Sequence, residues 1–353
     1  MDEGRIIGIF RMGAQTLPLI ILTGNPKERG CQHGAQLSLA IHAALARLKR
    51  STDADDWSKA TSKAAKSFQQ LSGIAPYLTE ELEGIALSTG LATLDIYLLS
   101  CFEYFADGQT GCTSAGITGP QGAIIAQNWD APVDSLEHLA VLIHEDENER
   151  LVTIASAGTL GWVGMNGHGL AFVNNDLLLD RAGAGLPSLA IRRMMLAQSS
   201  TEDAVAVLRG HRHMSGRHYL FGDASGILRT VEISPAAGIC ENDPCSISHT
   251  NHPLSQPIAM WEDIEAAARF YPSSRERLRA ARRHSLSSID DIKALLRDTT
   301  GTPDSICKSW SLREKTQTAF SVIFNCAERE ALIAIGQPDR KPFHRIRLQN
   351  GNH

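Results

Sequence analysis

The spacing of apolar residues changes near residue 110, and this change constrains the fold more than any other feature of the chain. Between residues 53 and 105 apolar side chains recur at intervals of about three and four, which predicts helices interrupted by a turn at residues 73–76. Beyond residue 111 the apolar residues gather in short runs bounded by Gly, Asn, Asp and Pro, which is typical of β-strands. The runs are GAIIAQNW, LAVLIHE, LVTIASA, GLAFVNN, HYLFGD and LRTVEIS. The sequence therefore predicts an α+β fold with a helical first third and a sheet-rich centre.

The last part of the chain mixes both signals. Helices are predicted at residues 187–198 and 201–208, and again at residues 273–284 and 289–297. The runs AFSVIFN and EREALIAIG predict a closing hairpin. Because the sequence has no internal repeat and no long linker, we expect the helices and antiparallel strands to form one layered body.

Composition narrows the function classes. The chain has 353 residues, of which 43% are hydrophobic and 21% charged, which excludes disordered, collagen-like and coiled-coil proteins. A formal net charge of -5 gives no general footprint for nucleic acid or an anionic membrane. The apolar run before Arg11 is too short for a signal peptide, and no stretch of about 18 apolar residues predicts a membrane span. Seven cysteines without a secretory signal favour free thiols and a cytoplasmic location.

The segment GQTGCTSAGITGPQGAIIAQNWDAP, residues 108–132, is the most informative for chemistry. Glycines and other small residues around Cys112 allow an unusual backbone path and leave room for a second group beside the sulfur. A thiol is a useful nucleophile only when a base or a lowered pKa supplies the thiolate. On its own Cys112 is more readily explained as a buried thiol that packs like a small apolar residue.

Several motifs in this order resemble the acyl-coenzyme A:6-aminopenicillanic acid acyltransferase family of N-terminal-nucleophile (Ntn) hydrolases. Each motif is weak alone, and the ordered set carries the resemblance. The motifs are TGNPKERGCQHGAQL (23–37), GCTS (111–114), QNWD (127–130), GMNGHGLAFVNN (164–175), HYLFGDASG (218–226), SHTNHP (248–253), PSSRERL (272–278) and DSIC (304–307).

The resemblance implies a chain that cuts itself between Gly111 and Cys112. It also implies an Ntn αββα four-layer sandwich with two antiparallel sheets and a helical N-terminal segment. Residues 1–111 would form the α subunit and residues 112–353 the nucleophile-bearing β subunit. The liberated α-amine of Cys112 would accept the thiol proton, because its reference pKa is near 8. The two fragments are expected to stay associated, and a homo-oligomer of that heterodimer is left open.

The implied reaction is hydrolysis of a linear, non-peptide or short peptide-like amide through a thioester on Cys112. Two alternatives remain open. One is an acyltransferase that moves an acyl group from acyl-coenzyme A or an amide to an amine, and the other is a catalytically silent ligand-binding protein with the same fold. The expected partner is a small-molecule amide, with no metal, organic cofactor, nucleic acid or membrane.

The resemblance also assigns roles to polar residues. Asn251 is expected to be the main oxyanion donor, and Asn175 a donor or substrate positioner. Asp130 is expected to hold the new ammonium or the thiol by hydrogen bonding. Family members place a basic residue near the start of the penultimate strand, where this chain has only the offset Arg313 and Lys315, for which solvated loop positions are expected. The substrate-binding candidates are Asn128, Trp129 and Trp162.

Other groups of residues in the sequence suggest different sites. Cys240, Cys245, His249 and His252 have the elements of a zinc site without its short paired spacing. Cys112 with His249 or His252 would form a papain-like pair, although no local protease signature surrounds Cys112. The histidines and arginines of residues 209–218 are expected to form a solvated basic loop, and the basic segment 273–284 a surface helix.

Overall fold

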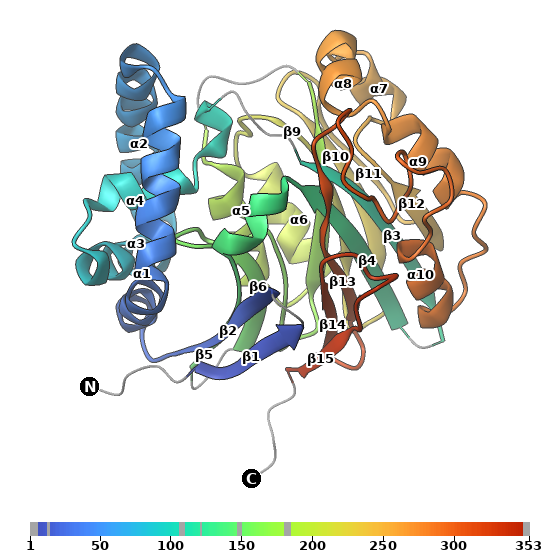
Figure 1. Ribbon diagram of the computed structural model, residues 1–353, viewed down its shortest axis with the longest axis horizontal. Helices are drawn as coiled ribbons and strands as arrows, with labels where there is room; N and C mark the ends of the chain where they lie inside the picture. The colour runs from blue at the N-terminus through green and yellow to red at the C-terminus, as the bar shows by residue number, and fades with distance from the viewer. Residues whose placement is uncertain are drawn as a thin grey trace.

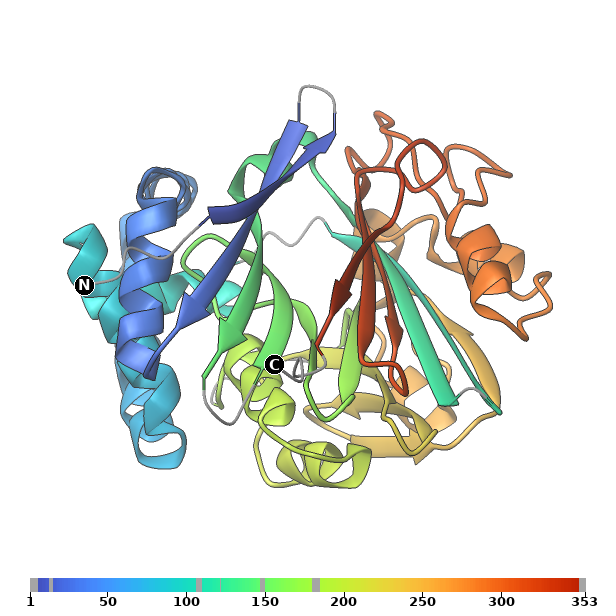
Figure 2. The ribbon, with the colours of Figure 1, turned by 90° about the horizontal axis from the view of Figure 1, so that it is seen from below.

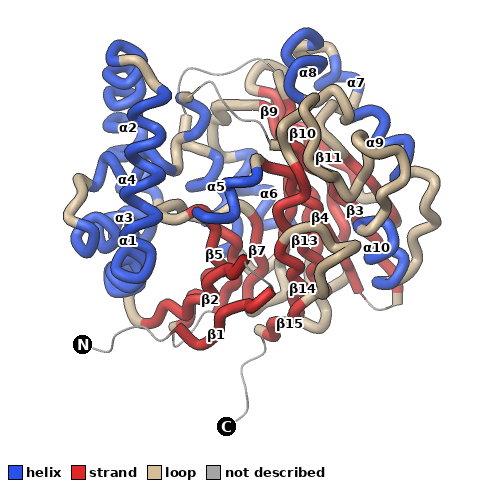
Figure 3. The backbone as a smooth tube through the Cα atoms, in the orientation of Figure 1, coloured by secondary structure: helices blue, strands red, loops and turns tan. Residues whose placement is uncertain are grey.

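In the computed structural model two β-sheets lie face to face between layers of helices (Figures 1 and 2). This arrangement confirms the predicted αββα four-layer sandwich. The structure describes residues 6–12, 15–105, 110–120, 122–146, 150–179 and 185–348. Figure 3 separates its helices from its strands. The helices are α1 (Pro26–Ser51), α2 (Ala54–Ile74), α3 (Pro76–Thr89), α4 (Thr93–Leu99), α5 (Ser188–Leu196), α6 (Thr201–Arg209), α7 (Gln256–Ala259), α8 (Ile264–Phe270), α9 (Ser274–Ala281) and α10 (Ile289–Leu296), with short 3-10 helices at Phe102–Tyr104 and Val133–His138.

The larger sheet, called sheet A, has nine strands within the described residues. Its order is β1-β2-β5-β6-β7-β8-β9-β10-β11. The pairing of β2 with β5 is parallel, so the prediction of two purely antiparallel sheets is wrong at this one position. The strands are β1 (Ile6–Met12), β2 (Gln15–Thr23), β5 (Leu139–Glu145), β6 (Arg150–Ser156), β7 (Val163–Asn166), β8 (Ala171–Leu177), β9 (Gly216–Gly222), β10 (Leu228–Ser234) and β11 (Gly238–Asn242).

The smaller sheet, called sheet B, is antiparallel in every described pairing and has the order β12-β3-β4-β13-β14-β15. Its central strands β3 and β4 form a hairpin in which Cys112 lies opposite Trp129 and Gly111 opposite Asp130. The hairpin therefore brings the two ends of the segment 111–130 together. The strands are β12 (Ser246–His249), β3 (Gly111–Gly119), β4 (Gly122–Ala131), β13 (Gln317–Asn325), β14 (Glu330–Ile335) and β15 (His344–Arg347).

The helical N-terminal part begins with a strand pair that the sequence analysis did not predict. Strands β1 and β2 precede α1 and join the edge of sheet A. Helix α1 starts where the Asn25 side chain accepts a hydrogen bond from the backbone N–H of Glu28, whose carboxylate accepts in return from the N–H of Asn25. The predicted turn at residues 73–76 is the junction between α2 and α3, where Pro76 opens the second helix.

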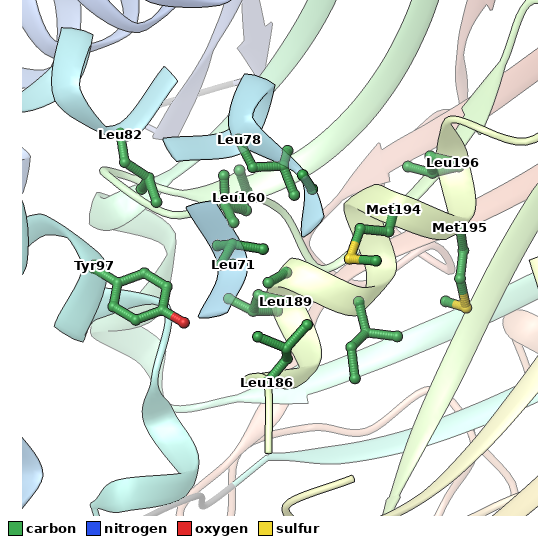
Figure 4. Close-up of a cluster of buried hydrophobic side chains, with 14 of the residues drawn as sticks. Leu71, Leu78, Leu82, Tyr97, Leu160, Leu186, Leu189, Met194, Met195 and Leu196 are labelled. Carbon is green, nitrogen blue, oxygen red and sulfur yellow. The ribbon is translucent and has the colours of Figure 1, made fainter. Parts of the chain in front are cut away.

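Three apolar cores separate the four layers. One lies between helices α1–α6 and sheet A, and Figure 4 shows how leucines from α2, α3 and α5 meet there. The second fills the space between the two sheets, and the third packs α9 and α10 against sheet B. The first core contains residues from both sides of position 111, so residues 1–111 and the rest of the chain share one hydrophobic interior.

No single described helix has the length and hydropathy needed to cross a membrane. Helices α3 and α4 pass the test only as a pair, with a bend of 113° between them. Both contribute buried residues to the first core, and buried core helices pass the same test.

Candidate functional site

Cys112 is the second residue of β3 and opens onto a cavity of about 480 Å³. Its side chain lies in the space between the sheets, and the residue is only 3% exposed. Burial, reinforced by the negative charge of Asp130, raises the pKa of the Cys112 thiol to about 12. In the uncleaved chain this thiol is therefore protonated at neutral pH and needs a proton acceptor before it can attack a carbonyl.

The backbone around Cys112 is held by Asn251 and Arg277. The N–H of Cys112 donates to Asn251 Oδ1 at 2.8 Å, and the Arg277 guanidinium donates to the same oxygen at 2.8 Å. Arg277 also donates to the carbonyl oxygen of Cys112 at 2.5 Å and to Thr113 Oγ1 at 2.9 Å. Asn251 is expected from the sequence to be the main oxyanion donor. In the structure its oxygen faces Cys112, its Nδ2 donates to the carbonyl of Asp176 at 3.1 Å, and the oxyanion role stays a prediction.

Arg277 corrects the interpretation of residues 273–284 as a surface helix. It is fully buried on α9, and its Nε donates to Ser273 Oγ at 3.0 Å. The signal that could have identified it is its position beside Leu278 and close to Ala281 on the face of α9 that packs inward.

Asp130 lies next to Gly111 and is completely buried. Its Oδ1 accepts a hydrogen bond from Thr318 Oγ1 at 2.8 Å, while its Oδ2 has no hydrogen-bond partner among the described residues and lies 3.9 Å from Lys308 Nζ. Burial raises the pKa of Asp130, and the positive charges of Lys308 and Arg277 act against that rise. The free oxygen beside Gly111 is thus a suitable acceptor for a proton or an ammonium group formed there.

Lys308, rather than Arg313 or Lys315, is the basic residue that the last part of the chain brings to the site. Its side chain is 1% exposed and forms an ion pair with Glu314. Arg313 is exposed and pairs with Asp304, and Lys315 is also exposed, so the solvated loop positions expected for both agree with the structure. Lys308 follows the DSIC motif directly, which is the signal that could have pointed to it.

Asn175 lies between the two sheets. Its Oδ1 accepts hydrogen bonds from Ser114 Oγ at 2.6 Å and from His218 Nδ1 at 2.8 Å, and its Nδ2 has no partner among the described residues. On β8 it is Asn174, not Asn175, that lines the cavity. The role predicted for Asn175 as donor or substrate positioner stays a prediction.

Two stacked histidines continue this polar layer. The rings of His218 and His249 lie 3.6 Å apart, and burial together with the neighbouring His249 holds the pKa of His218 well below its usual value. Nε2 of His249 donates to Glu232 at 2.7 Å, and Glu232 also accepts from the N–H groups of Leu254 at 2.6 Å and Ser255 at 2.8 Å. This contact fixes the loop that carries Asn251. Arg217 and His218 are both buried in β9, so the expected solvated loop at residues 209–218 is wrong for these two residues.

Of the three predicted substrate-binding residues, Trp129 and Trp162 line the cavity, with ring centroids 5.8 Å apart. Asn128 points to the other side of β4, where its Nδ2 donates to the carbonyls of Leu296 at 2.9 Å and Ile306 at 3.0 Å. Asn128 therefore ties sheet B to α10 and does not reach the cavity, because neighbouring residues of a strand face opposite ways.

The rival constellations have other contacts. His249 bonds to Glu232, and His252 Nδ1 lies 2.7 Å from Ser274 Oγ, so the ring nitrogens of the proposed papain-like partners have partners other than the thiol. In the part of the chain that the structure describes, no three His, Cys, Asp or Glu side chains gather as a metal site.

Comparison with known proteins identifies a family for this chain. A model of the family described as acyl-coenzyme A:6-aminopenicillanic acid acyl-transferase matches residues 117–340. The 40 kDa form of the acyl-coenzyme A:6-aminopenicillanic-acid-acyltransferase of Emericella nidulans is 27% identical over 338 residues, 90% of this chain and 92% of that protein. Two solved structures also align: penicillin V acylase from Agrobacterium tumefaciens (TM-score 0.40, 14% identity, 64% of this chain and 82% of that chain) and a mutant of conjugated bile acid hydrolase from Clostridium perfringens (0.38, 12%, 69% and 99%).

Proposed function

Because this chain belongs to the acyl-coenzyme A:6-aminopenicillanic acid acyltransferase family of Ntn hydrolases, we propose that it is a self-processing amidohydrolase whose nucleophile is Cys112. One observation carries the proposal. Gly111 lies beside both the unpartnered oxygen of Asp130 and the guanidinium of Arg277, which donates to the carbonyl of Cys112, and Cys112 lines the large cavity.

Self-cleavage begins when the Cys112 sulfur attacks the carbonyl carbon of Gly111. The peptide C–N bond breaks, the nitrogen of Cys112 takes up a proton, and Gly111 becomes the acyl group of a thioester. Water then hydrolyses the thioester, which releases residues 1–111 with a new carboxylate and leaves Cys112 with a free amine. In the substrate reaction that amine accepts the thiol proton, the sulfur attacks the substrate carbonyl, the C–N bond breaks, and the amine product leaves with that proton. Water then hydrolyses the thioester on Cys112, which releases the carboxylic acid and restores the thiol.

The surrounding residues have separate tasks in this scheme. Oδ1 of Asn251 keeps the nitrogen of Cys112 in place, and Nδ2 of Asn251 is the proposed donor to the developing oxyanion. The free Oδ2 of Asp130 accepts a hydrogen bond from the new ammonium group and balances its charge. The shared core supports the proposal that the two fragments remain associated after cleavage.

Mass spectrometry of denatured, purified protein tests self-cleavage. We expect two species, residues 1–111 and residues 112–353, because the thiol and the scissile peptide belong to adjacent residues. Cys112→Ala should give a single intact chain. An intact wild-type chain that nevertheless hydrolyses amides would show that the nucleophile is assigned incorrectly.

A side chain at position 111 should slow self-cleavage. A Cβ built on Gly111 would lie 3.2 Å from Asp130 Oδ2, which is a tight contact, and 3.5 Å from Arg277 Nη2, which is an ordinary one, so the branched side chain of Gly111→Val crowds the free oxygen of Asp130. We expect the cleavage rate, followed by gel electrophoresis, to fall by about 10- to 100-fold. Gly119→Val is the matched control, since a Cβ at that end of β3 meets no described atom within 4 Å. Equal rates for Gly111→Val and wild type would contradict the proposed arrangement.

Acyl transfer is the second candidate, because the relative from Emericella nidulans that covers 90% of this chain is named an acyltransferase. The two reactions differ in the acceptor that reaches the thioester. Incubation of processed protein with an N-acyl amino acid, with and without added amine, separates them: hydrolysis yields only the free acid, and transfer yields a new amide.

The free state of the seven cysteines supports a cytoplasmic location as part of the same proposal.

A further inference from the structure

Three arginines line the cavity next to Cys112, and they differ in how their charges are matched. Arg47 is half exposed and pairs with Asp134 at 2.8 Å. Arg217 is buried and forms an ion pair with Asp176, and Glu103 Oε1 lies 3.8 Å from it. The two acidic residues that line the cavity, Asp176 and Glu103, therefore both lie close to Arg217. Arg192 alone among these three arginines has no carboxylate within 4.0 Å in the described part of the chain.

Arg192 is nevertheless one of the most deeply buried charges of the protein, at 2% exposure. Its contacts are uncharged: Nη2 donates to Asn174 Oδ1 at 2.8 Å, and Nη1 donates to the carbonyl of Trp162 at 3.3 Å. Its Nε has no hydrogen-bond partner among the described residues. A buried cation surrounded only by dipoles is costly, and an anion bound in the cavity would offset that cost.

An aromatic wall connects Arg192 with the nucleophile. The guanidinium lies 5.7 Å from the centre of the Trp162 ring, which lies 5.8 Å from the ring of Trp129. Trp129 is the residue opposite Cys112 in the β3–β4 pair. A molecule along this wall would place an apolar part over the indoles, with its two ends at the thiol and at Arg192.

We propose that Arg192 is a specificity-determining residue that binds a single carboxylate on the amide substrate, separated from the scissile bond by an apolar part lying on Trp129 and Trp162. The inference rests on the proposed amidase function and adds the substrate class. A planar guanidinium with an unused Nε–H matches a carboxylate. One unmatched cation favours a monoanion, because a doubly charged phosphate would leave a buried charge uncompensated.

Binding to the Cys112→Ala chain tests the inference without requiring turnover. Two pairs of probes are used, since the carboxylate can belong to either half of the substrate. N-benzoyl-6-aminohexanoic acid and its terminal carboxamide place the charge on the amine side, and suberic acid monoanilide and its terminal carboxamide place it on the acyl side, in each case behind an apolar chain. We expect the carboxylate of one pair to bind about 10- to 100-fold more tightly than its carboxamide by calorimetry. The pair whose carboxylate binds more tightly than its carboxamide shows whether the charge lies on the amine side or the acyl side of the substrate.

Variants in the same Cys112→Ala background test whether Arg192 causes the preference for the carboxylate probe. Arg192→Gln should abolish the difference within the discriminating pair, and Arg47→Gln, a cavity-lining arginine already paired with Asp134, should retain it. Arg192→Lys should retain only part of it, because an ammonium keeps the charge and loses the planar fork. The lysine variant provides the test if the glutamine variant does not fold.

Equal binding within both pairs, absence of binding by either carboxylate at millimolar concentration, or an undiminished preference in Arg192→Gln or Arg192→Lys would overturn the inference. Failure of the proposed function has a different signature. In that case the wild-type protein does not cleave itself or hydrolyse amides, whatever the binding of the probes to Cys112→Ala.

Discussion

Arg277→Met is expected to reduce the rate of self-cleavage by about two to three orders of magnitude. The guanidinium donates hydrogen bonds to the carbonyl of Cys112, to Thr113 Oγ1 and to Asn251 Oδ1. Its loss therefore frees the carbonyl of Cys112 and removes one of the two donors that hold Asn251 Oδ1 in place. It also removes a buried positive charge that acts against the raised pKa of Asp130. We expect the free energy of unfolding to fall by about 1–3 kcal/mol for each buried oxygen that loses its donor, because the partners of Arg277 are neutral acceptors. Cleavage kinetics and urea denaturation measure the two effects.

The matched control lies on the same helix. Arg279 is exposed on α9 and pairs only with Glu276, so Arg279→Met should change neither the cleavage rate nor the stability appreciably. Arg277→Lys should have an intermediate cleavage rate, since one ammonium keeps the charge but cannot make all of the contacts of the guanidinium. A wild-type cleavage rate in a folded Arg277→Met protein would show that Arg277 has only a structural role.

The difference between the predicted and the observed site has a physical origin. Cys112, Asp130 and Asn251 could be predicted because each belongs to a short motif and has a functional group that suits the chemistry. Arg277 belongs to a motif and Lys308 directly follows one, but a basic residue in a polar helix or loop is normally solvated. Only the packing of α9 against sheet B, and of the segment around Lys308 against β13, shows that both charges are buried.

The same distinction holds for the fold. Helix α1 and the site strands β3 and β12 have no counterpart among the predicted elements, whereas α2, α5, α6, α10 and strands β4 and β13 have strong local patterns and were predicted close to their observed positions. Strand β2 was not, because Pro18 lies within it and proline is disfavoured in strands. Its parallel pairing with β5 joins residues more than a hundred positions apart, and no local pattern encodes such a contact. Asn128 was misplaced because it and the adjacent Trp129 were both assigned to the cavity, whereas consecutive residues of a strand face opposite sides and the sequence does not show which of the two faces the cavity.

Asn251→Ala should lower the rate of self-cleavage and of amide hydrolysis by about two to three orders of magnitude, which corresponds to the loss of an oxyanion donor. The substitution removes both the acceptor for the N–H of Cys112 and the Nδ2 donor. The loop itself should remain in place, because Glu232 binds the N–H groups of Leu254 and Ser255 and Ser274 Oγ accepts from the N–H of Asn251. Single-turnover kinetics on folded protein therefore report the chemical step.

Asn251→Asp separates the two roles of this side chain. An aspartate keeps an oxygen for the N–H of Cys112 and for Arg277, but it replaces the Nδ2 donor with an acceptor that faces the carbonyl of Asp176. If oxyanion stabilisation dominates, Asn251→Asp is as slow as Asn251→Ala in both reactions. If holding the nitrogen of Cys112 dominates, the aspartate variant recovers most of the self-cleavage rate. Asn242→Ala, at an exposed asparagine of β11, is the control that should match wild type. Rates near wild type for Asn251→Ala would remove Asn251 from the mechanism.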